Sequence, residues 1–446
     1  MTQSDAVPTV RPEADTHAGH RRPRRTTILI AVSALAALTV AAWFLIASRG
    51  PIDHEVWALD QGTDRIHVYD SDHQQVSVID VSPAALRTVD PTFAPESGRT
   101  VPHMIDFDSD HRYAFVAATA GGATIVLDAV ERVVVAVLRT GPGTHMAAVT
   151  PDDDAVWVAV IGAKRLIEIP LDLTAERPTF ELGRVIDVEA LLASTGFTYP
   201  SFSPVCHDFD DDGRAWVTLG PGTAQGGLFV FDPATAEVVH AYDPQVVRAN
   251  CGIGFTADGR QAIANWSGVF GADVEDGEGE WYVFDTATFD LLDTRTSAGV
   301  DAHGVRRTPD GREFWQMNRG TGNGLRIDAR SFEVIGELQV GDAPDILDFS
   351  PDGRFAYVTQ RGPNPLSGDP HVSRGSAPGV LVIDTETGAL VRRLDPATAQ
   401  DPDGKVLNDI HGIGVRRRTG GERFVVAAPV LFTAAPTGIF GCHLPI

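Results

Sequence analysis

A short segment recurs along the chain and limits its possible folds more than any other feature of the sequence. The copy FSPDGRFAYVTQ, which begins at Phe349, has the pattern of a short strand, a tight turn and a second strand with alternating side chains. Asp and Gly supply the backbone angles that such a turn requires. Five further copies are FDSDHRYAFVAA from Phe107, VTPDDDAVWVAV from Val149, FDDDGRAWVTLG from Phe209, FTADGRQAIANW from Phe255 and RTPDGREFWQMN from Arg307. Regular recurrence of this kind predicts a repeat protein.

A second pair of strands with an Asp-led turn follows most copies, as in GLFVFDPATAEVVHAY and GVLVIDTETGALVRRL. Four strands per repeat indicate a β-propeller blade. Residues 55–81 lack the opening strand, and residues 409–428 begin with such a strand but have no complete unit behind it. Together they predict one blade closed by both termini. Opening strands near residues 103, 145, 206, 251, 303, 345 and 411 predict an all-β, seven-bladed β-propeller over residues 49–446.

The stretch TTILIAVSALAALTVAAWFLIAS, residues 26–48, carries no charge and is long enough to cross a membrane as a helix. Four arginines lie just before it and only Arg49 directly after it, which predicts a cytoplasmic N-terminus. Residues 1–25 are then a short disordered cytoplasmic tail, 26–48 a transmembrane signal anchor, and the propeller lies outside the cell membrane. A cleaved signal peptide is the alternative, although the apolar run is longer than the usual core of such a peptide.

Polar side chains occupy one position of the repeat. His103, His145, Cys251, His303 and Asp345 each stand six residues before the turn position that proline holds in TPDG. His207, with Cys206 beside it, falls two residues later than this rule, and His411 precedes a longer turn. Because the innermost strands of a propeller surround its channel, these residues are expected to converge. Imidazole and thiolate are ligands for copper, zinc and iron.

Two of these segments resemble known metalloenzyme propellers. FAYVTQ resembles the YVTN-type propeller repeat, and PHMIDFDSDHRYAFVAATAGGATIVLD is similar to a blade of the d-type-haem propeller of bacterial cytochrome nitrite reductases. DAHGVRRTPDG is similar to histidine-bearing segments in the N-terminal propeller of nitrous oxide reductase, a copper enzyme. The resemblance implies a seven-bladed fold and either copper or haem iron bound by channel histidines. The chain departs from these families in having five candidate histidines and no CxxCH for a c-type haem.

The first hypothesis is therefore a membrane-anchored, extracytoplasmic propeller that binds a transition metal, copper or iron, or a haem-like cofactor. The expected metal ligands are His103, His145, His207, His303 and His411, with Cys251, Asp345 and Cys206 as auxiliary ligands or supporting groups. A disulfide between Cys206 and Cys251 is an equal alternative to free or ligating thiols. If the protein is an enzyme, an oxidoreductase is favoured over a hydrolase, since no GxSxG motif is present.

Two other functions remain open. The second hypothesis is a non-catalytic propeller whose loops bind a cell-envelope protein or polymer, and the third is a metal-dependent, lactonase-like hydrolase acting on a small-molecule substrate through Asp345. Nucleic acid is excluded as a partner by a net charge of −24. Calcium is not favoured, because the acidic loop that starts at Asp208 has Leu219 where a calcium-binding loop requires Glu.

Overall fold

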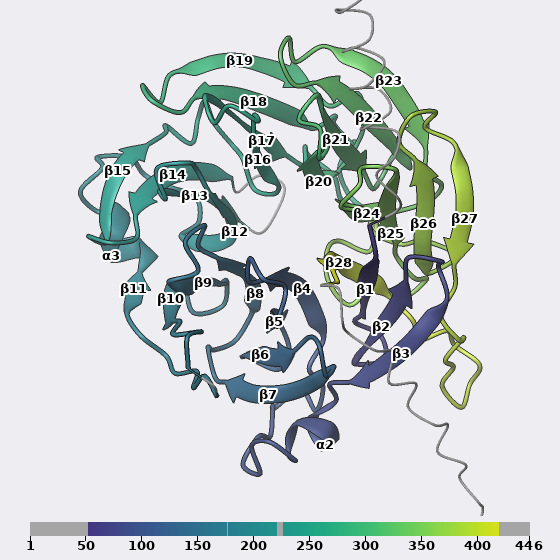
Figure 1. The fold of residues 1–446 in the computed structure, drawn as a ribbon. Helices are drawn as coiled ribbons and strands as arrows, with labels where there is room; N and C mark the ends of the chain where they lie inside the picture. The colour runs from purple at the N-terminus through teal and green to yellow at the C-terminus, as the bar shows by residue number, and fades with distance from the viewer. Residues whose placement is uncertain (1–51, 176, 221–225, 419–446) are drawn as a thin grey trace, which may run out of the picture. The chain divides into compact units, whose positions relative to one another are not determined.

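The structure is a computed structural model that describes residues 52–175, 177–220 and 226–418. Seven four-stranded antiparallel sheets are arranged in a ring with their first strands innermost (Figure 1). The predicted seven-bladed β-propeller is therefore confirmed. The predicted tail at 1–25 and the predicted span at 26–48 lie outside the described residues, within which no helix is long and apolar enough to cross a membrane.

Six blades consist of four consecutive strands that run from the inside of the ring outward. These strands are β4 (Pro102–Phe107), β5 (Tyr113–Ala118), β6 (Ala123–Asp128) and β7 (Val133–Leu138); β8 (Thr144–Val149), β9 (Ala155–Val160), β10 (Arg165–Pro170) and β11 (Val185–Asp187); β12 (Ser203–Phe209), β13 (Ala215–Gly220), β14 (Gly227–Asp232) and β15 (Glu237–Ala241); β16 (Ile253–Phe255), β17 (Gln261–Trp266), β18 (Glu280–Asp285) and β19 (Leu291–Thr296); β20 (Ala302–Arg307), β21 (Glu313–Asn318), β22 (Asn323–Asp328) and β23 (Val334–Gln339); β24 (Pro344–Phe349), β25 (Phe355–Gln360), β26 (Gly379–Asp384) and β27 (Leu390–Leu394). Two short helices, α2 (Pro83–Leu86) and α3 (Val188–Leu192), lie in connections between blades.

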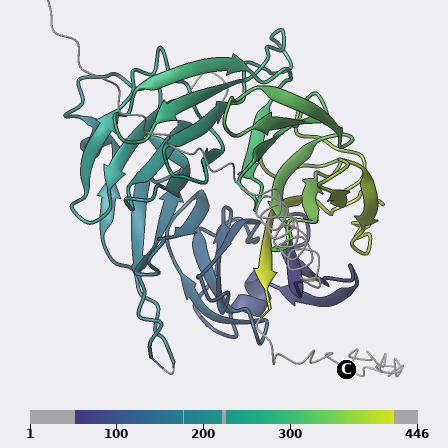
Figure 2. The ribbon, with the colours of Figure 1, turned by 45° about the horizontal axis from the view of Figure 1, so that its top comes forward.

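The seventh blade joins the two ends of the described chain. Its strands are β28 (Ile410–Arg417), β1 (His54–Asp60), β2 (Arg65–Asp70) and β3 (Gln75–Asp80), in that order from the inside outward. β28 pairs with β1 in antiparallel register, with Val415 opposite Val56 and Gly414 opposite Trp57. Figure 2 shows the yellow β28 lying against the purple N-terminal strands. The predicted closure by both ends of the chain is confirmed.

The core between blades repeats one aromatic contact. A tryptophan on the second strand of a blade packs edge-on against the phenylalanine that ends the first strand of the next blade. Ring centroids are 5.6 Å apart for Trp57 and Phe107, and 5.4 Å apart for Trp315 and Phe349. Edge-to-face pairs at this spacing are favourable beyond the area that they bury. The phenylalanine that opens several copies of the repeat motif therefore holds neighbouring blades together.

Candidate functional site

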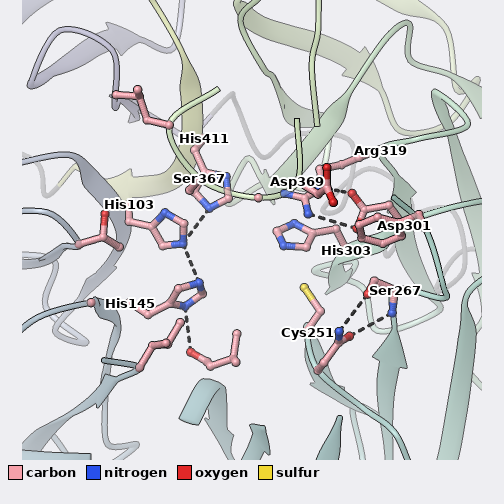
Figure 3. A pocket seen from close by; sticks show the side chains of 18 residues that line it. His103, His145, Cys251, Ser267, Asp301, His303, Arg319, Ser367, Asp369 and His411 are labelled. Atoms are coloured by element: carbon pink, nitrogen blue, oxygen red, sulfur yellow. Dashed lines mark hydrogen bonds and ion pairs between the residues drawn. The ribbon is translucent and has the colours of Figure 1, made fainter. Parts of the chain in front are cut away.

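The innermost strands bring most of the predicted site residues to one cavity. His103, His145, His303 and His411 lie near the start of β4, β8, β20 and β28, and Cys251 lies just before β16. All five line a cavity of about 570 Å³ together with Arg319 (Figure 3). Asp345, near the start of β24, is 0% exposed and contacts two of these histidines. The repeat register thus places polar groups from six blades at one end of the channel.

His207 does not reach the cavity. Its Nε2 hydrogen-bonds with the carbonyl oxygen of Trp157 at 2.9 Å, and it packs beside Phe209 in the adjoining core. Val205, two residues earlier, holds the repeat position at the cavity, and β12 pairs with β13 with the same kind of register irregularity that β20 and β24 have in their own blades. The structure therefore separates His207 from the other four predicted ligands. The sequence could have revealed that His207 is out of place. Phe107 stands four residues after His103, and the corresponding Phe209 stands only two residues after His207.

A second repeat position, absent from the sequence prediction, also serves the site. It is the first residue after the second strand of each blade. Its occupants in six blades are Gln61, Thr119, Ile161, Ser267, Arg319 and Arg361. Four of them line the cavity, and the side chains of Gln61 and Arg361 contact residues of the site. Alignment of the repeats at the end of this strand would have identified these positions.

Asp345 is the electrostatic centre of the site. One carboxylate oxygen lies 2.5 Å from Nδ1 of His303 and 3.3 Å from Nη1 of Arg319. The other lies 2.5 Å from Nδ1 of His411 and 3.0 Å from Nη1 of Arg361. Burial opposes its ionisation, but His411, Arg319 and His303 hold the pKa of the Asp345 carboxyl well below its usual range. Four groups from three consecutive blades therefore share one buried negative charge.

Asp301 and Asp409 complete the charge balance of this buried cluster. Asp301 forms a two-point ion pair with Arg319 at 2.7 and 3.1 Å. Asp409 does the same with Arg361, with both contacts at 2.8 Å. Each guanidinium thus has its own carboxylate in addition to Asp345, in the paired geometry that arginine favours. Neither arginine therefore presents an unpaired charge to the cavity.

His303 differs from its neighbours in carrying a positive charge at neutral pH. Burial and the nearby Arg319 oppose a charged ring, but the Asp345 carboxylate, 2.5 Å from Nδ1, favours it, and the pKa of His303 is raised to about 9. His303 is an imidazolium in the resting site, so it has no lone pair to offer a metal. Among the described histidines that line the cavity, His303 is the one whose positive charge favours donating a hydrogen bond to a ligand.

Three other imidazoles are neutral and meet at their Nε2 atoms. Nε2 of His103 lies 2.8 Å from Nε2 of His145 and 3.1 Å from Nε2 of His411 (Figure 3). Burial lowers the pKa of His145 to about 3 and that of His411 to about 4, and it also lowers the pKa of His103 well below its usual value. We refer to His103, His145 and His411 as the imidazole cluster. Each member carries one ring proton at neutral pH.

The outer nitrogens of the imidazole cluster determine where those protons lie. His145 Nδ1 donates to the carbonyl oxygen of Val205 at 2.9 Å, and His411 Nδ1 donates to Asp345, so Nε2 of each ring carries a lone pair. His103 Nδ1 instead accepts from the side-chain amide of Gln61 at 2.5 Å, which places the proton of His103 on Nε2. One proton therefore faces two lone pairs, and one of the two contacts within the cluster lacks a hydrogen. An electron-pair acceptor in the cavity would relieve this mismatch.

The imidazole cluster fits part of what a metal centre requires. Histidines that bind metals commonly donate the other ring N–H to a carboxylate or a backbone carbonyl, as His411 and His145 do here. However, no group of three or more His, Cys, Asp or Glu side chains in the described part of the chain is arranged to hold a metal ion. The donor set suits a metal that takes one or two imidazoles from the protein and its other ligands from elsewhere.

The cysteines beside the cavity are free thiols. Cys251 is buried and Cys206 is half-buried, and no bond joins the two sulfur atoms. Burial raises the pKa of the Cys251 thiol well above its usual value, so the group is protonated at neutral pH. A protonated thiol is a poor metal ligand. The arrangement therefore gives no support to Cys251 as a ligand in the resting state.

Glycines directly after three ring residues allow the innermost strands to approach one another. A Cβ atom at Gly412 would lie 2.1 Å from the carbonyl oxygen of His103. Gly412→Ala is therefore expected to push β28 away from β4, separate His411 from His103 and lower the free energy of unfolding by about 1–3 kcal/mol. Thermal unfolding would measure the loss. The matched control is Gly336→Ala, where the nearest atom would lie at an ordinary 3.5 Å, and equal stability of the two variants would contradict the proposed close approach.

Comparison with known proteins identifies the fold. No protein-family model matches the sequence, and no curated protein matches it. Among solved structures, a chain of Kuenenia stuttgartiensis hydrazine synthase is similar with a TM-score of 0.52 and 15% identity, covering 72% of this chain and 90% of that one. The dihydro-heme d1 dehydrogenase NirN in complex with DHE gives a TM-score of 0.47 and 14% identity, covering 81% of this chain and 74% of that one. At 15% identity, the likeness to the hydrazine synthase chain establishes a shared fold and nothing beyond the fold, in agreement with the expected resemblance at that level.

Proposed function

We propose that the cavity binds a metal-containing organic cofactor of the haem type, with His411 or His145 donating an Nε2 lone pair to the metal. The observation that carries this proposal is the mismatch in the imidazole cluster, where two buried lone pairs face one proton. A bound metal would take up one of these lone pairs. A cofactor of this class supplies redox chemistry, with the protein contributing the ligand and the electrical environment.

The size of the cavity favours a cofactor over a bare ion. A volume of about 570 Å³ is within the range of pockets that bind organic molecules. A bare copper or iron ion would need several protein ligands around one point, whereas a cofactor that brings its own ring of donors needs only one or two. His303 lines the same cavity, with its ring centroid 5.8 Å from that of His411, and its imidazolium can donate to a polar group on the same ligand.

Titration with hemin, followed by the Soret absorption band, tests this function on the full-length protein. We expect saturable binding of one hemin per chain, and we expect His411→Ala combined with His145→Ala to weaken it by at least about tenfold. His240→Ala is the control, because His240 stacks on Phe289 away from the cavity. Unaltered hemin binding in the double variant would overturn the proposal. Stoichiometric copper by elemental analysis without hemin binding would instead support a bare-ion site.

The other predicted functions receive less support from the geometry. Asp345 has both oxygens occupied by positively charged or N–H groups, so it is poorly suited to bind the divalent metal of a lactonase-like hydrolase. Binding of a cell-envelope protein or polymer through the loops stays a prediction. We also retain as proposals the anchoring of the chain by residues 26–48 and the extracytoplasmic position of the propeller, which rest on the sequence.

A further inference from the structure

Cys206 and Cys251 lie on neighbouring blades but are backbone neighbours in space. The Thr218 hydroxyl accepts from the backbone N–H of Cys206 at 3.1 Å and lies 3.2 Å from the carbonyl oxygen of Cys206 and 3.3 Å from that of Cys251. Thr359 joins Ile346 and His411 in the same way on other blades, so this bridge is a feature of the repeat. Among the described residues, the bridge at Thr218 has a cysteine at both ends.

The two side chains also lie near each other. Cys206 and His303 both influence the pKa of the Cys251 thiol, and Cys251 lines the cavity. A disulfide needs an S–S distance of about 2 Å, so the two sulfur atoms must approach each other for the bond to form. Because Thr218 holds the two backbones near each other, we expect this approach to need side-chain rotation rather than movement of the blades.

We propose that Cys206 and Cys251 form a reversible disulfide by exchange with a disulfide-containing molecule, and that this bond modifies the wall of the cavity. The half-buried Cys206 reacts first. Its thiolate attacks the incoming disulfide, forms a mixed disulfide and releases one thiol. The Cys251 sulfur then attacks the mixed disulfide and displaces a second thiol. Two protein thiols are oxidised, one external disulfide is reduced to two thiols, and the two protons move to those released thiols.

The bond would change the ligand environment of the cavity. Oxidation removes the S–H group of Cys251 from its contact with His303. The His303 imidazolium, paired with Asp345 through Nδ1, then loses its thiol partner on the cavity side. The redox state of the thiol pair is thereby coupled to the one charged histidine of the site. This inference stands without the proposed cofactor, since it concerns only the thiols and His303.

Treatment of the folded, full-length protein with oxidised glutathione tests the proposal, with Cys442→Ser removing the third cysteine. We expect the two remaining thiols to disappear together, the mass to fall by about 2 Da, and peptide mapping without reductant to link Cys206 to Cys251. Dithiothreitol should restore both thiols. The melting temperature of the oxidised form should rise by a few degrees, because the bond ties two blades together.

Single substitutions provide the matched controls. With Cys251→Ser, the reaction should stop at a glutathione adduct on Cys206, and with Cys206→Ser the buried Cys251 should stay largely unmodified. A stable glutathione adduct in the protein that keeps both cysteines would overturn the proposal. So would loss of both thiols only after unfolding in denaturant. Thermal unfolding of each serine variant verifies that the comparison is made on folded protein.

Discussion

Acidification from pH 7 to pH 5 is expected to lower the free energy of unfolding by about 5 kcal/mol in total. The main cause is burial of neutral histidines, which lowers the pKa of His145 to about 3, those of His207 and His411 to about 4, and that of His103 well below its usual value. In the unfolded chain each takes up a proton near pH 6.5. Below about pH 6.5 the unfolded state therefore binds more protons than the folded state, so the free energy of unfolding falls as the pH falls.

Opposing groups reduce but do not reverse this trend. Each of the four buried histidines costs about 2 kcal/mol at pH 5. Burial raises the pKa values of Asp106 and Asp108 to about 6, so each of these carboxyls returns about 1 kcal/mol when it is protonated. His303, whose pKa is raised to about 9, has the opposite sign: its contribution is fully present below pH 6.5 and is lost as the pH rises through 9.

Melting temperatures at pH 7, 6 and 5 and constant ionic strength would measure this dependence. His207→Gln is the informative variant, because His207 lies outside the cavity and the amide of Gln can still donate to the carbonyl oxygen of Trp157. This variant should lose about a quarter of the histidine contribution to the pH dependence. A melting temperature that is constant or higher at pH 5 would contradict the assignment of neutral, buried histidines.

Asp345→Asn is expected to cost about 3–5 kcal/mol of stability or to prevent folding, because it leaves buried cations without their shared counter-charge. Asp301 and Asp409 still neutralise Arg319 and Arg361, but His303 loses the carboxylate at 2.5 Å that keeps it charged. The pKa of His303 should therefore fall from about 9 toward or below its ordinary value. Loss of this imidazolium is expected together with the loss of stability.

Chemical denaturation and histidine NMR would separate the two effects. The control is Glu386→Gln, an exposed carboxylate on the same blade, which should change stability by less than about 0.5 kcal/mol. If Asp345→Asn fails to fold, His303→Gln in the same chain removes the group that lost its carboxylate and should restore part of the stability. If the Asp345→Asn variant alone is as stable as the parent protein, the four contacts of Asp345 contribute little to stability.

Local chemistry made the blades predictable. Each copy of the repeat contains the turn residues that set its hairpin, and glycines such as Gly311 and Gly353 adopt the positive φ values, 74° and 72°, that the turn requires. The same repeat carries the phenylalanine that contacts the next blade, so local sequence and packing agree. Closure of the ring was predictable because residues 55–81 lack the first strand of a blade, and residues 409–428 contain such a strand without a complete unit behind it.

The position of the site was predictable from the sequence, but the protonation states of its histidines were not. Spacing within the repeat placed His103, His145, His303 and His411 at one cavity. It could not show that His303 is charged while the others are neutral, because that difference depends on Asp345, from the next blade, and on the guanidinium groups of Arg319 and Arg361. His207 stands two residues after the repeat position, so residue spacing already set it apart, and Val205 takes its place at the cavity. Spacing predicts where side chains point, whereas ionisation depends on contacts made only after folding.

The joining of β28 to β1 also determines when the pocket becomes complete during the life of the chain. His411 comes from the last described strand and contacts His103, 308 residues earlier, while Gln61 follows the first strand. Contacts between such distant residues form late, since they need all of the intervening chain. A ribosome must therefore extend the polypeptide past His411 before the imidazole cluster can assemble. Chains that stop before β28 would lack the cluster, so ligand capture would report that β28 had been made and had joined β1.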